Sequence, residues 1–254
     1  YLRGLDLSPG GVASRASYLR EVLRAARDLW DMPVPLAEVD GAIAAARRLK
    51  LLGKPGVRTR RPTADEIAAI IAYADQRPGA MIDLGAIVRV LSVLPLRAGE
   101  LLGIQWDDID RARRTVLIRG RKHPDINVRE RNDQEVPLIE FGGVDTFALV
   151  ACRPEYLPSP FPYKRPSVST AFGQVALHCQ IRDLHLHDLR AHAASSLLEA
   201  GMSIPLVALI SGHANWKVLQ KNYARLDPLA VHDAVRRLTP QPSAPQDIPA
   251  RKPA

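Results

Sequence analysis

The segment from residue 80 to residue 110, AMIDLGAIVRVLSVLPLRAGELLGIQWDDID, is strongly apolar and constrains the fold more than any other. Its residues favour helix, and a helix that is apolar on most of its faces has to be buried. Pro95 interrupts it, because a proline inside a helix removes a backbone donor and clashes with the preceding turn. Hydrophobic residues make up 46% of the 254-residue chain, enough for a full core around this segment. No apolar run reaches the roughly 18 residues of a membrane-spanning helix.

A strand pair follows this segment. RTVLIRG (114–120) and QEVPLI (134–139) have the composition of strands and flank the polar segment RKHPDINVRERND (121–133). From Ser167 onward the pattern is helical, and Gly201 is placed to end the helix that begins near HDLRAH. These patterns predict a mainly α fold with a small antiparallel β-sheet (α+β).

The N-terminal part of the chain is set apart by a linker. Residues 14–52 carry apolar residues at helical spacing, and GKPGVRTRRP (53–62) then breaks the pattern with Gly, Pro and basic residues. Thr63 and Glu66 have the spacing of a capping box, which predicts a new helix there. We therefore expect three parts: a partial helical domain with its basic linker, a large second domain, and a Pro-rich, disordered tail. Their predicted ranges are 1–57, 58–236 and 237–254.

The charge of the chain favours a polyanionic partner. Its formal net charge is +8 and its pI about 9.8, which is typical of proteins that bind nucleic acid, although a basic protein without such a partner remains an alternative. The two cysteines form neither a disulfide framework nor a C-x-x-C pair, and the N-terminus lacks the layout of a secretory signal. We expect a cytoplasmic protein without a membrane segment, a structural metal or a cofactor.

A set of chemically active side chains lies in and around the second domain. His187 and Arg190 are three residues apart at a predicted helix start and so share a face. Arg97 lies in an apolar context, where an unpaired charge is costly, so its partner is either Glu100 or a bound phosphate. Each such residue alone is more often a packing residue than a catalytic one. The candidate catalytic residues are Arg97, Lys122, His187, Arg190, His213 and Tyr223.

Together these groups fit attack on a phosphodiester without a metal ion. Two guanidiniums can bind the non-bridging oxygens and stabilise the charge that develops in a pentacoordinate phosphorane. A phenol can attack as a nucleophile, an ammonium can protonate the leaving alkoxide, and an imidazole can accept the phenolic proton. We assign Glu100, Trp106 and Asp188 to structural roles.

Four segments resemble the tyrosine recombinases, the phage integrase family of site-specific DNA recombinases. They are LRAGELLGIQWDDID, RGRKHPD with the following EVPL, HDLRAHAASSLLEAGMS and ISGHANWKVLQKNYARL, and they occur in the family's order. The resemblance covers roughly residues 58–230, with the family's DNA breaking-rejoining fold. Residues 14–52 resemble, more weakly, the latter part of its core-binding domain. Because only two of the usual helices are found and the chain begins with Tyr1, we expect that domain to be incomplete.

The resemblance also implies roles for single residues. Arg97 and Arg190 would bind the scissile phosphate, Lys122 would protonate the 5′-oxygen, and His187 would act as a base or hydrogen-bonding partner. His213 would hold a phosphate oxygen, and Tyr223 would attack to give a 3′-phosphotyrosyl link, without ATP. We expect further DNA contacts from a set of basic residues: Arg58, Arg60, Arg61, Arg121, Lys164, Arg165 and Lys217.

The partners implied by the resemblance are double-stranded DNA and copies of the same chain. The resemblance implies that the protein forms a tetramer on synapsed DNA, and it allows a monomer when the protein is free of DNA. Two alternatives keep the same fold: an enzyme of the type IB topoisomerase class, and a DNA-binding regulator that has lost turnover. The first relaxes supercoils without a second site, and the second forms no covalent DNA adduct.

Overall fold

The computed structural model of the chain describes residues 6–54, 58, 60–121 and 132–213. It divides into two compact units, Tyr1–Thr59 and Arg60–Ala254. Lys122, Lys217 and Tyr223, and the tail predicted at 237–254, lie outside the described residues.

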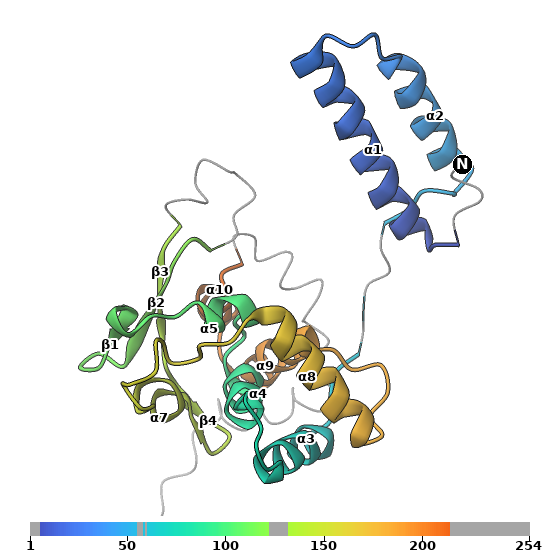
Figure 1. Ribbon diagram of the computed structural model, residues 1–254. Helices are drawn as coiled ribbons and strands as arrows, with labels where there is room; N and C mark the ends of the chain where they lie inside the picture. Colours follow the sequence, from blue (N-terminus) through green and yellow to red (C-terminus); the bar gives the residue numbers. More distant parts are fainter. Residues whose placement is uncertain (1–5, 55–57, 59, 122–131, 214–254) are drawn as a thin grey trace, which may run out of the picture. The chain divides into compact units, whose positions relative to one another are not determined.

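The first unit contains two packed helices (Figure 1). α1 (Pro9–Trp30) begins after Ser8, whose hydroxyl accepts from the Gly11 N–H at 3.2 Å. α2 (Leu36–Arg48) follows a short connection, so the structure has two helices in the range 14–52 that the sequence indicated as helical. The helices share a small apolar contact made by Val12, Ala16, Ala46 and Leu52.

The second unit begins with three helices, two of which are formed by the apolar segment from residue 80 to residue 110. α3 (Ala64–Gln76) starts at the predicted capping box, in which the Thr63 hydroxyl accepts from the Glu66 N–H at 3.1 Å. α4 (Leu84–Val93) is buried along most of its length and ends just before Pro95, as predicted. α5 (Ala98–Leu102) follows after a short connection that contains Pro95, so the apolar segment forms two short helices.

The predicted strand pair is confirmed. β2 (Thr115–Ile118) and β3 (Gln134–Pro137) pair antiparallel with Val116 opposite Val136, and β1 (Ile109–Asp110) adds a third strand beside β2. The single-turn 3-10 helix η2 (Trp106–Asp108) leads into β1. A second hairpin, β4 (Glu140–Phe141) with β5 (Val144–Asp145), and the helix α7 (Thr146–Ala151) were not predicted.

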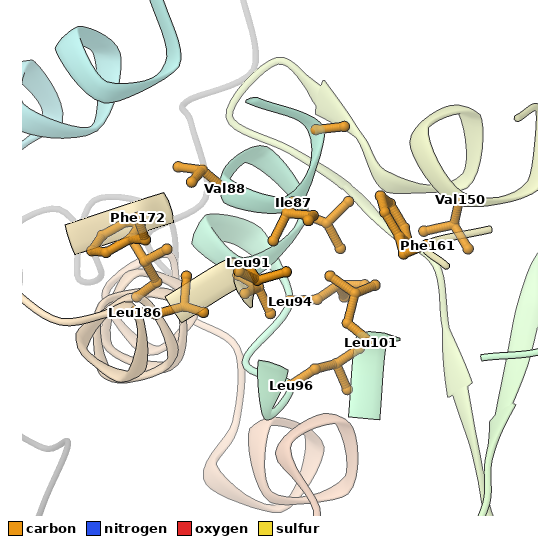
Figure 2. Packing of buried hydrophobic residues seen from close by; sticks show 14 of the residues in the cluster. Ile87, Val88, Leu91, Leu94, Leu96, Leu101, Val150, Phe161, Phe172 and Leu186 are labelled. Atoms are coloured by element: carbon orange, nitrogen blue, oxygen red, sulfur yellow. The ribbon is translucent and has the colours of Figure 1, made fainter. Parts of the chain in front are cut away.

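Three further helices complete the described part of this unit: α8 (Arg165–His178), α9 (Leu186–Glu199) and α10 (Ile204–Ser211). α4 packs against α3, α7, α8 and α9, so it forms the centre of the core (Figures 1 and 2). Gly201, with φ of +93°, follows α9 as the sequence predicted. The architecture is the expected mainly α fold with small antiparallel sheets. None of the helices in the described ranges has the length and apolar character needed to cross a membrane.

Candidate active site

A cavity of about 530 Å³ opens in the second unit where α5, β2, α8 and α9 approach one another. Its lining includes five arginines and two histidines but only one carboxylate. The cavity is therefore suited to an anionic ligand. These basic lining residues are Arg97, Arg119, Arg121, Arg165, Arg190, His185 and His187.

Arg190 projects from the first turns of α9 and is almost fully buried, with 2% of the residue exposed. Its Nη1 donates to the Pro95 carbonyl at 2.7 Å, and its Nη2 donates to the Ser211 carbonyl at 2.8 Å. A buried guanidinium needs such acceptors, because its donors lose their hydration on burial. The turn at Pro95 and the end of α10 thus fix Arg190 at the cavity wall.

Arg97 stands at the start of α5 and is partly exposed. Its Nη1 donates to Glu100 at 2.5 Å, and its backbone N–H donates to the same carboxylate at 2.9 Å. The partner considered from the sequence, Glu100, is therefore present. The other partner considered, a phosphate, stays a prediction.

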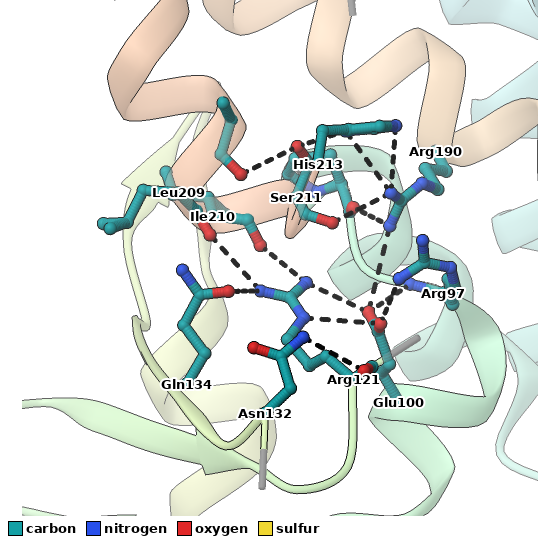
Figure 3. A network of polar contacts seen from close by, with 12 residues as sticks. Arg97, Glu100, Arg121, Asn132, Gln134, Arg190, Leu209, Ile210, Ser211 and His213 are labelled. Atoms are coloured by element: carbon teal, nitrogen blue, oxygen red, sulfur yellow. Dashed lines mark hydrogen bonds and ion pairs between the residues drawn. The ribbon is translucent and has the colours of Figure 1, made fainter. Parts of the chain in front are cut away.

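Glu100 is the carboxylate shared by the basic groups of this site (Figure 3). Besides Arg97 it accepts from Arg121 Nη2 at 3.1 Å, and it lies 3.8 Å from Arg190 Nη1. Burial alone would raise its pKa, but the charges and hydrogen bonds of Arg121 and Arg97 outweigh burial and lower the pKa below its ordinary value. One ionised carboxylate therefore faces three guanidiniums, which leaves a positive site.

Arg121, which we expected from the sequence among the DNA contacts, is buried in the structure and bonded within the protein. It is 1% exposed, and Nη1 donates to Gln134 at 2.7 Å and to the Leu209 carbonyl at 3.2 Å. Nη2 donates to Glu100 and, at 3.0 Å, to the Ile210 carbonyl (Figure 3). The guanidinium therefore joins the end of β2 to the C-terminal end of α10 and acts as a structural group.

His213 follows directly after α10. Gly212 ends that helix with φ of +67°, and the His213 ring then lies against Arg190, with Nε2 at 3.3 Å from Nη2. The His213 Nδ1 is 2.6 Å from the Ser211 hydroxyl. Burial, followed by the charges of Arg190 and Arg97, lowers the pKa of His213 to about 3. The imidazole is consequently neutral at physiological pH.

His187 lies in the first turn of α9 and lines the same cavity. Its side chain is exposed, yet the groups around it exclude enough water to lower its pKa, and the charge of Arg190 lowers the pKa further. A neutral imidazole at a basic cavity is able to accept a proton. The structure thus places Arg97, His187 and Arg190 at one cavity, with His213 in contact with Arg190.

The basic residues predicted to bind DNA fall into two described groups. Lys164 and Arg165 are exposed at the start of α8, and Arg58 is exposed in the linker. Arg60 pairs with Glu66, and Arg61 forms a bidentate pair with Glu199, with N–O distances of 2.5 and 2.7 Å. The charges of these two linker arginines are thus partly compensated within the second unit.

Three residues of the site were missed in the sequence. Ser211 contacts both Arg190 and His213, Gln134 accepts from Arg121, and Arg119 lines the cavity while pairing with the buried Asp108. The only signal for Ser211 was a hydroxyl residue in the apolar stretch IPLVALISGH. Among the described residues, no three His, Cys, Asp or Glu side chains are grouped as metal ligands.

Comparison with known proteins places these observations in a family. The model of the phage integrase family matches residues 60–229. The chain is 27% identical over 224 residues to the shufflon-specific DNA recombinase of Escherichia coli, covering 82% of this chain and 53% of that protein. It is 25% identical over 174 residues to a putative integrase/recombinase of Haemophilus influenzae, covering 67% and 54%. The chain therefore spans about half the length of these curated relatives.

Solved structures show the same fold. The XerA recombinase crystal structure gives a TM-score of 0.53 at 18% identity, covering 89% of this chain and 84% of that one. A lambda integrase tetramer bound to a Holliday junction gives a TM-score of 0.58 at 19% identity, covering 86% and 60%.

Proposed function

Because this chain belongs to the phage integrase family, we propose that it cleaves and rejoins DNA strands at a specific site through a covalent bond to Tyr223. The observation that carries the proposal is that Arg97, His187 and Arg190 line one basic cavity while His213 contacts Arg190. These side chains come from separate segments, so their meeting depends on the fold and not on the local sequence.

The two arginines would bind the scissile phosphate. Arg190 is held by two carbonyls and Arg97 by Glu100, so their guanidiniums are positioned before a substrate arrives. Donors that are already oriented stabilise the charge of the pentacoordinate transition state without reorganising during the reaction. With that stabilisation supplied by guanidinium groups, the proposed reaction requires no metal ion and no cofactor.

The proton transfers follow from the remaining groups. The Tyr223 oxygen attacks phosphorus as the bond from phosphorus to the 5′-oxygen breaks, and Lys122 protonates that leaving oxygen. The phenolic proton passes to His187, whose lowered pKa keeps its imidazole neutral and able to accept it. The products are a 3′-phosphotyrosyl link and a free 5′-hydroxyl, and attack by a 5′-hydroxyl of the partner strand reverses the step without ATP.

The proposed partner is double-stranded DNA, bound through exposed basic residues such as Arg58, Lys164 and Arg165. We propose a tetramer at synapsis and a monomer off DNA, since the related lambda integrase has been solved as a tetramer on a Holliday junction. The first unit would contact DNA as part of a core-binding domain. The same proposal locates the protein in the cytoplasm, on nucleoid DNA.

Trapping of a covalent adduct tests this function. DNA flanking the protein's own gene is first footprinted to find a bound site, and that site is then made as a nicked duplex whose short 5′-hydroxyl fragment diffuses away after cleavage. We expect a protein–DNA adduct that peptide mapping places on Tyr223. Tyr223→Phe should bind DNA without forming it, whereas Tyr156→Phe, at an exposed position, should react normally.

The same experiment separates the alternatives. Specific DNA binding without any adduct would contradict the proposal and favour a regulator. Relaxation of a supercoiled plasmid that lacks the footprinted site would favour the topoisomerase class.

A further inference from the structure

Arg119 lines the cavity but has no part in the mechanism proposed above. It follows β2 directly and shares the cavity lining with Arg97, Arg165 and Arg190. Arg97 and Arg190 are assigned to the scissile phosphate. A phosphodiester has only two non-bridging oxygens, and two guanidiniums are enough to bind both of them. The cavity therefore carries more guanidinium groups than one phosphate requires.

The guanidinium of Arg119 is held along one edge by Asp108. Its Nε and Nη2 each lie 2.6 Å from Asp108 Oδ1, and the Asp108 side chain is only 1% exposed. The second carboxylate oxygen, Oδ2, accepts from the Gln105 backbone N–H at 3.0 Å. Asp108 is the last residue of η2, which contacts β2. The fold thus fixes the carboxylate, and the carboxylate orients the arginine.

The backbone next to Arg119 is fixed as well. The Gly120 N–H donates to the Asp133 carboxylate at 2.8 Å, and the Arg121 N–H donates to the Asn132 carbonyl at 2.9 Å. These contacts join the chain that leaves β2 to the chain that enters β3. The position of Arg119 is therefore set before any ligand binds.

The opposite edge of the Arg119 guanidinium is open to a ligand. Arginine has five N–H groups, and Asp108 receives the Nε–H and one N–H of Nη2. Within the described ranges, no group accepts from the remaining three, and the side chain is 59% exposed. The charges of Asp107 and Asp133 act on Arg119, yet neither of these two carboxylates forms an ion pair with it. A planar fork that is fixed on one edge and open on the other can bind an oxyanion bidentately.

The size of the cavity allows more than one phosphate. Its volume of about 530 Å³ lies within the range of about 300–1,000 Å³ that is typical of pockets for whole organic ligands. A stretch of DNA strand that enters such a cavity brings several phosphates, since each nucleotide carries one.

We propose that Arg119 binds a second phosphate of the DNA strand, next to the scissile phosphate, and that Asp108 is its positioning residue. The inference rests on the proposed function in taking DNA as the ligand of this cavity, but it does not require strand cleavage. A contact with a phosphate fixes the register of a strand without reading its bases. Arg119 would thus help to place the scissile phosphate at Arg97 and Arg190.

Single neutral phosphates in the bound DNA test this contact. The footprinted site is made with one methylphosphonate at a time, which replaces a charged non-bridging oxygen by a methyl group. Affinity is measured with the full chain carrying Tyr223→Phe, so that cleavage does not enter. On ordinary DNA, Arg119→Ala should weaken binding about tenfold, as expected for a lost hydrogen bond to a charged group. It should also reduce the slope of log affinity against log salt by about 1.

The position at which the two losses fail to add identifies the contact. At the phosphate bound by Arg119, a methylphosphonate should cost the Arg119→Ala protein little, because the interaction is already absent. Arg190→Ala should show the same behaviour at a different phosphate. Coupling of both arginines to one phosphate would place Arg119 on the scissile group. Additive losses at every position would leave Arg119 as a structural partner of Asp108, and either result overturns the inference.

Two further variants separate binding from folding. Arg119→Ala leaves the buried Asp108 without its partner, so a loss of stability is expected. Arg119→Lys keeps a positive charge beside Asp108, but one ammonium does not reproduce a fork that binds two groups at once. We expect its urea unfolding to stay close to that of the original protein while most of the phosphate coupling is lost. Arg111→Ala, which removes an exposed partner of Glu155 outside the cavity lining, is the control and should couple to no phosphate.

Asp108→Asn tests the positioning residue. The amide weakens the hold on Arg119, so coupling should fall at the phosphate assigned to Arg119 and stay unchanged at the phosphate assigned to Arg190. Equal losses at both phosphates would show a general effect on the fold, and unchanged coupling at both would show that Arg119 needs no orientation. Each of these results would remove Asp108 from the proposal.

The inference and the proposed function can fail separately in these experiments. An adduct on Tyr223 without a second coupled phosphate would leave the proposed function standing and overturn the inference. A second coupled phosphate without any adduct would support the inference and contradict DNA cleavage by this chain.

Discussion

Gly212 leaves the space that the guanidinium of Arg121 occupies. A Cβ added at Gly212 would lie 2.4 Å from Arg121 Cζ and 2.5 Å from Nε, closer than any side chain can approach. Gly212 also has φ of +67°, a conformation that L side chains rarely adopt. Two requirements therefore meet at the residue that precedes His213: a left-handed turn at the end of α10 and close contact with a buried arginine.

Gly212→Ala should lower the free energy of unfolding by more than its backbone strain alone. The strain is about 1–2 kcal/mol, and displacement of Arg121 adds to it. Gly142→Ala is the matched control, because Gly142 has φ of +59° and nothing within 4 Å of its added Cβ. Urea unfolding of both variants measures the difference, and equal losses would show that Arg121 moves aside without cost.

Arg121→Met should be among the most destabilising single changes in the second unit. It leaves Glu100 in a buried position without its Arg121 partner, and breaking a buried ion pair from one side costs about 3–5 kcal/mol. Adding Glu100→Gln should recover part of the loss. Arg113→Met, which breaks an exposed pair with Glu135, should cost less than about 1 kcal/mol. An Arg121→Met protein as stable as the original would contradict the buried network.

Features set by neighbouring residues were predictable from the sequence. The Thr63–Glu66 capping box and the helix break before Pro95 depend on spacing over a few residues, and both are present. The strand β2 was predictable because its sequence, TVLI, is rich in residues that favour strands, and β3 was predicted from the longer run QEVPLI that contains it. The two-residue strands β4 and β5 are too short to give a periodic signal.

Features set by distant partners were not predictable. Arg121 stands beside Lys122 in a polar segment, which is typical of an exposed basic residue, and its acceptors lie at Leu209 and Ile210. The contacts of Glu100 with Arg121 and Arg190 likewise depend on segments that are distant in the sequence. The convergence of Arg97, His187, Arg190 and His213 was expected only through the family resemblance, since their local sequences do not show that they meet.

Arg190→Ala should reduce the single-turnover rate of DNA cleavage by about 10²–10³, the usual effect of removing a donor aimed at developing charge. Arg190→Lys should not restore the rate, because one ammonium does not reproduce the fork that reaches the Pro95 and Ser211 carbonyls. Arg89→Ala, which breaks a pair with Asp75 on α3, is the control and should cleave normally. Normal cleavage by Arg190→Ala would remove this residue from the proposed mechanism.

Stability should fall as the pH falls below about 6.5, the ordinary pKa of histidine, partly because of His213. Its folded-state pKa is about 3, so between these values the unfolded chain binds a proton that the folded chain does not. The contribution is up to about 1.4 kcal/mol per pH unit. His213→Gln should therefore lose less stability than the original protein between pH 7 and pH 5 in urea unfolding. Parallel pH dependences in the two proteins would mean that His213 titrates normally when folded.

Lys122 is the proposed general acid, and a change of the leaving group tests this role. Lys122→Ala should cleave ordinary DNA slowly but recover much of its rate on DNA with sulfur at the 5′-bridging position, because a thiolate leaves without a proton. Arg190→Ala is the comparison, since it is proposed to act on the non-bridging oxygens and should stay slow on both substrates. An equal defect of Lys122→Ala on both DNAs would assign Lys122 to binding. The 5′-oxygen would then have to receive its proton from another group.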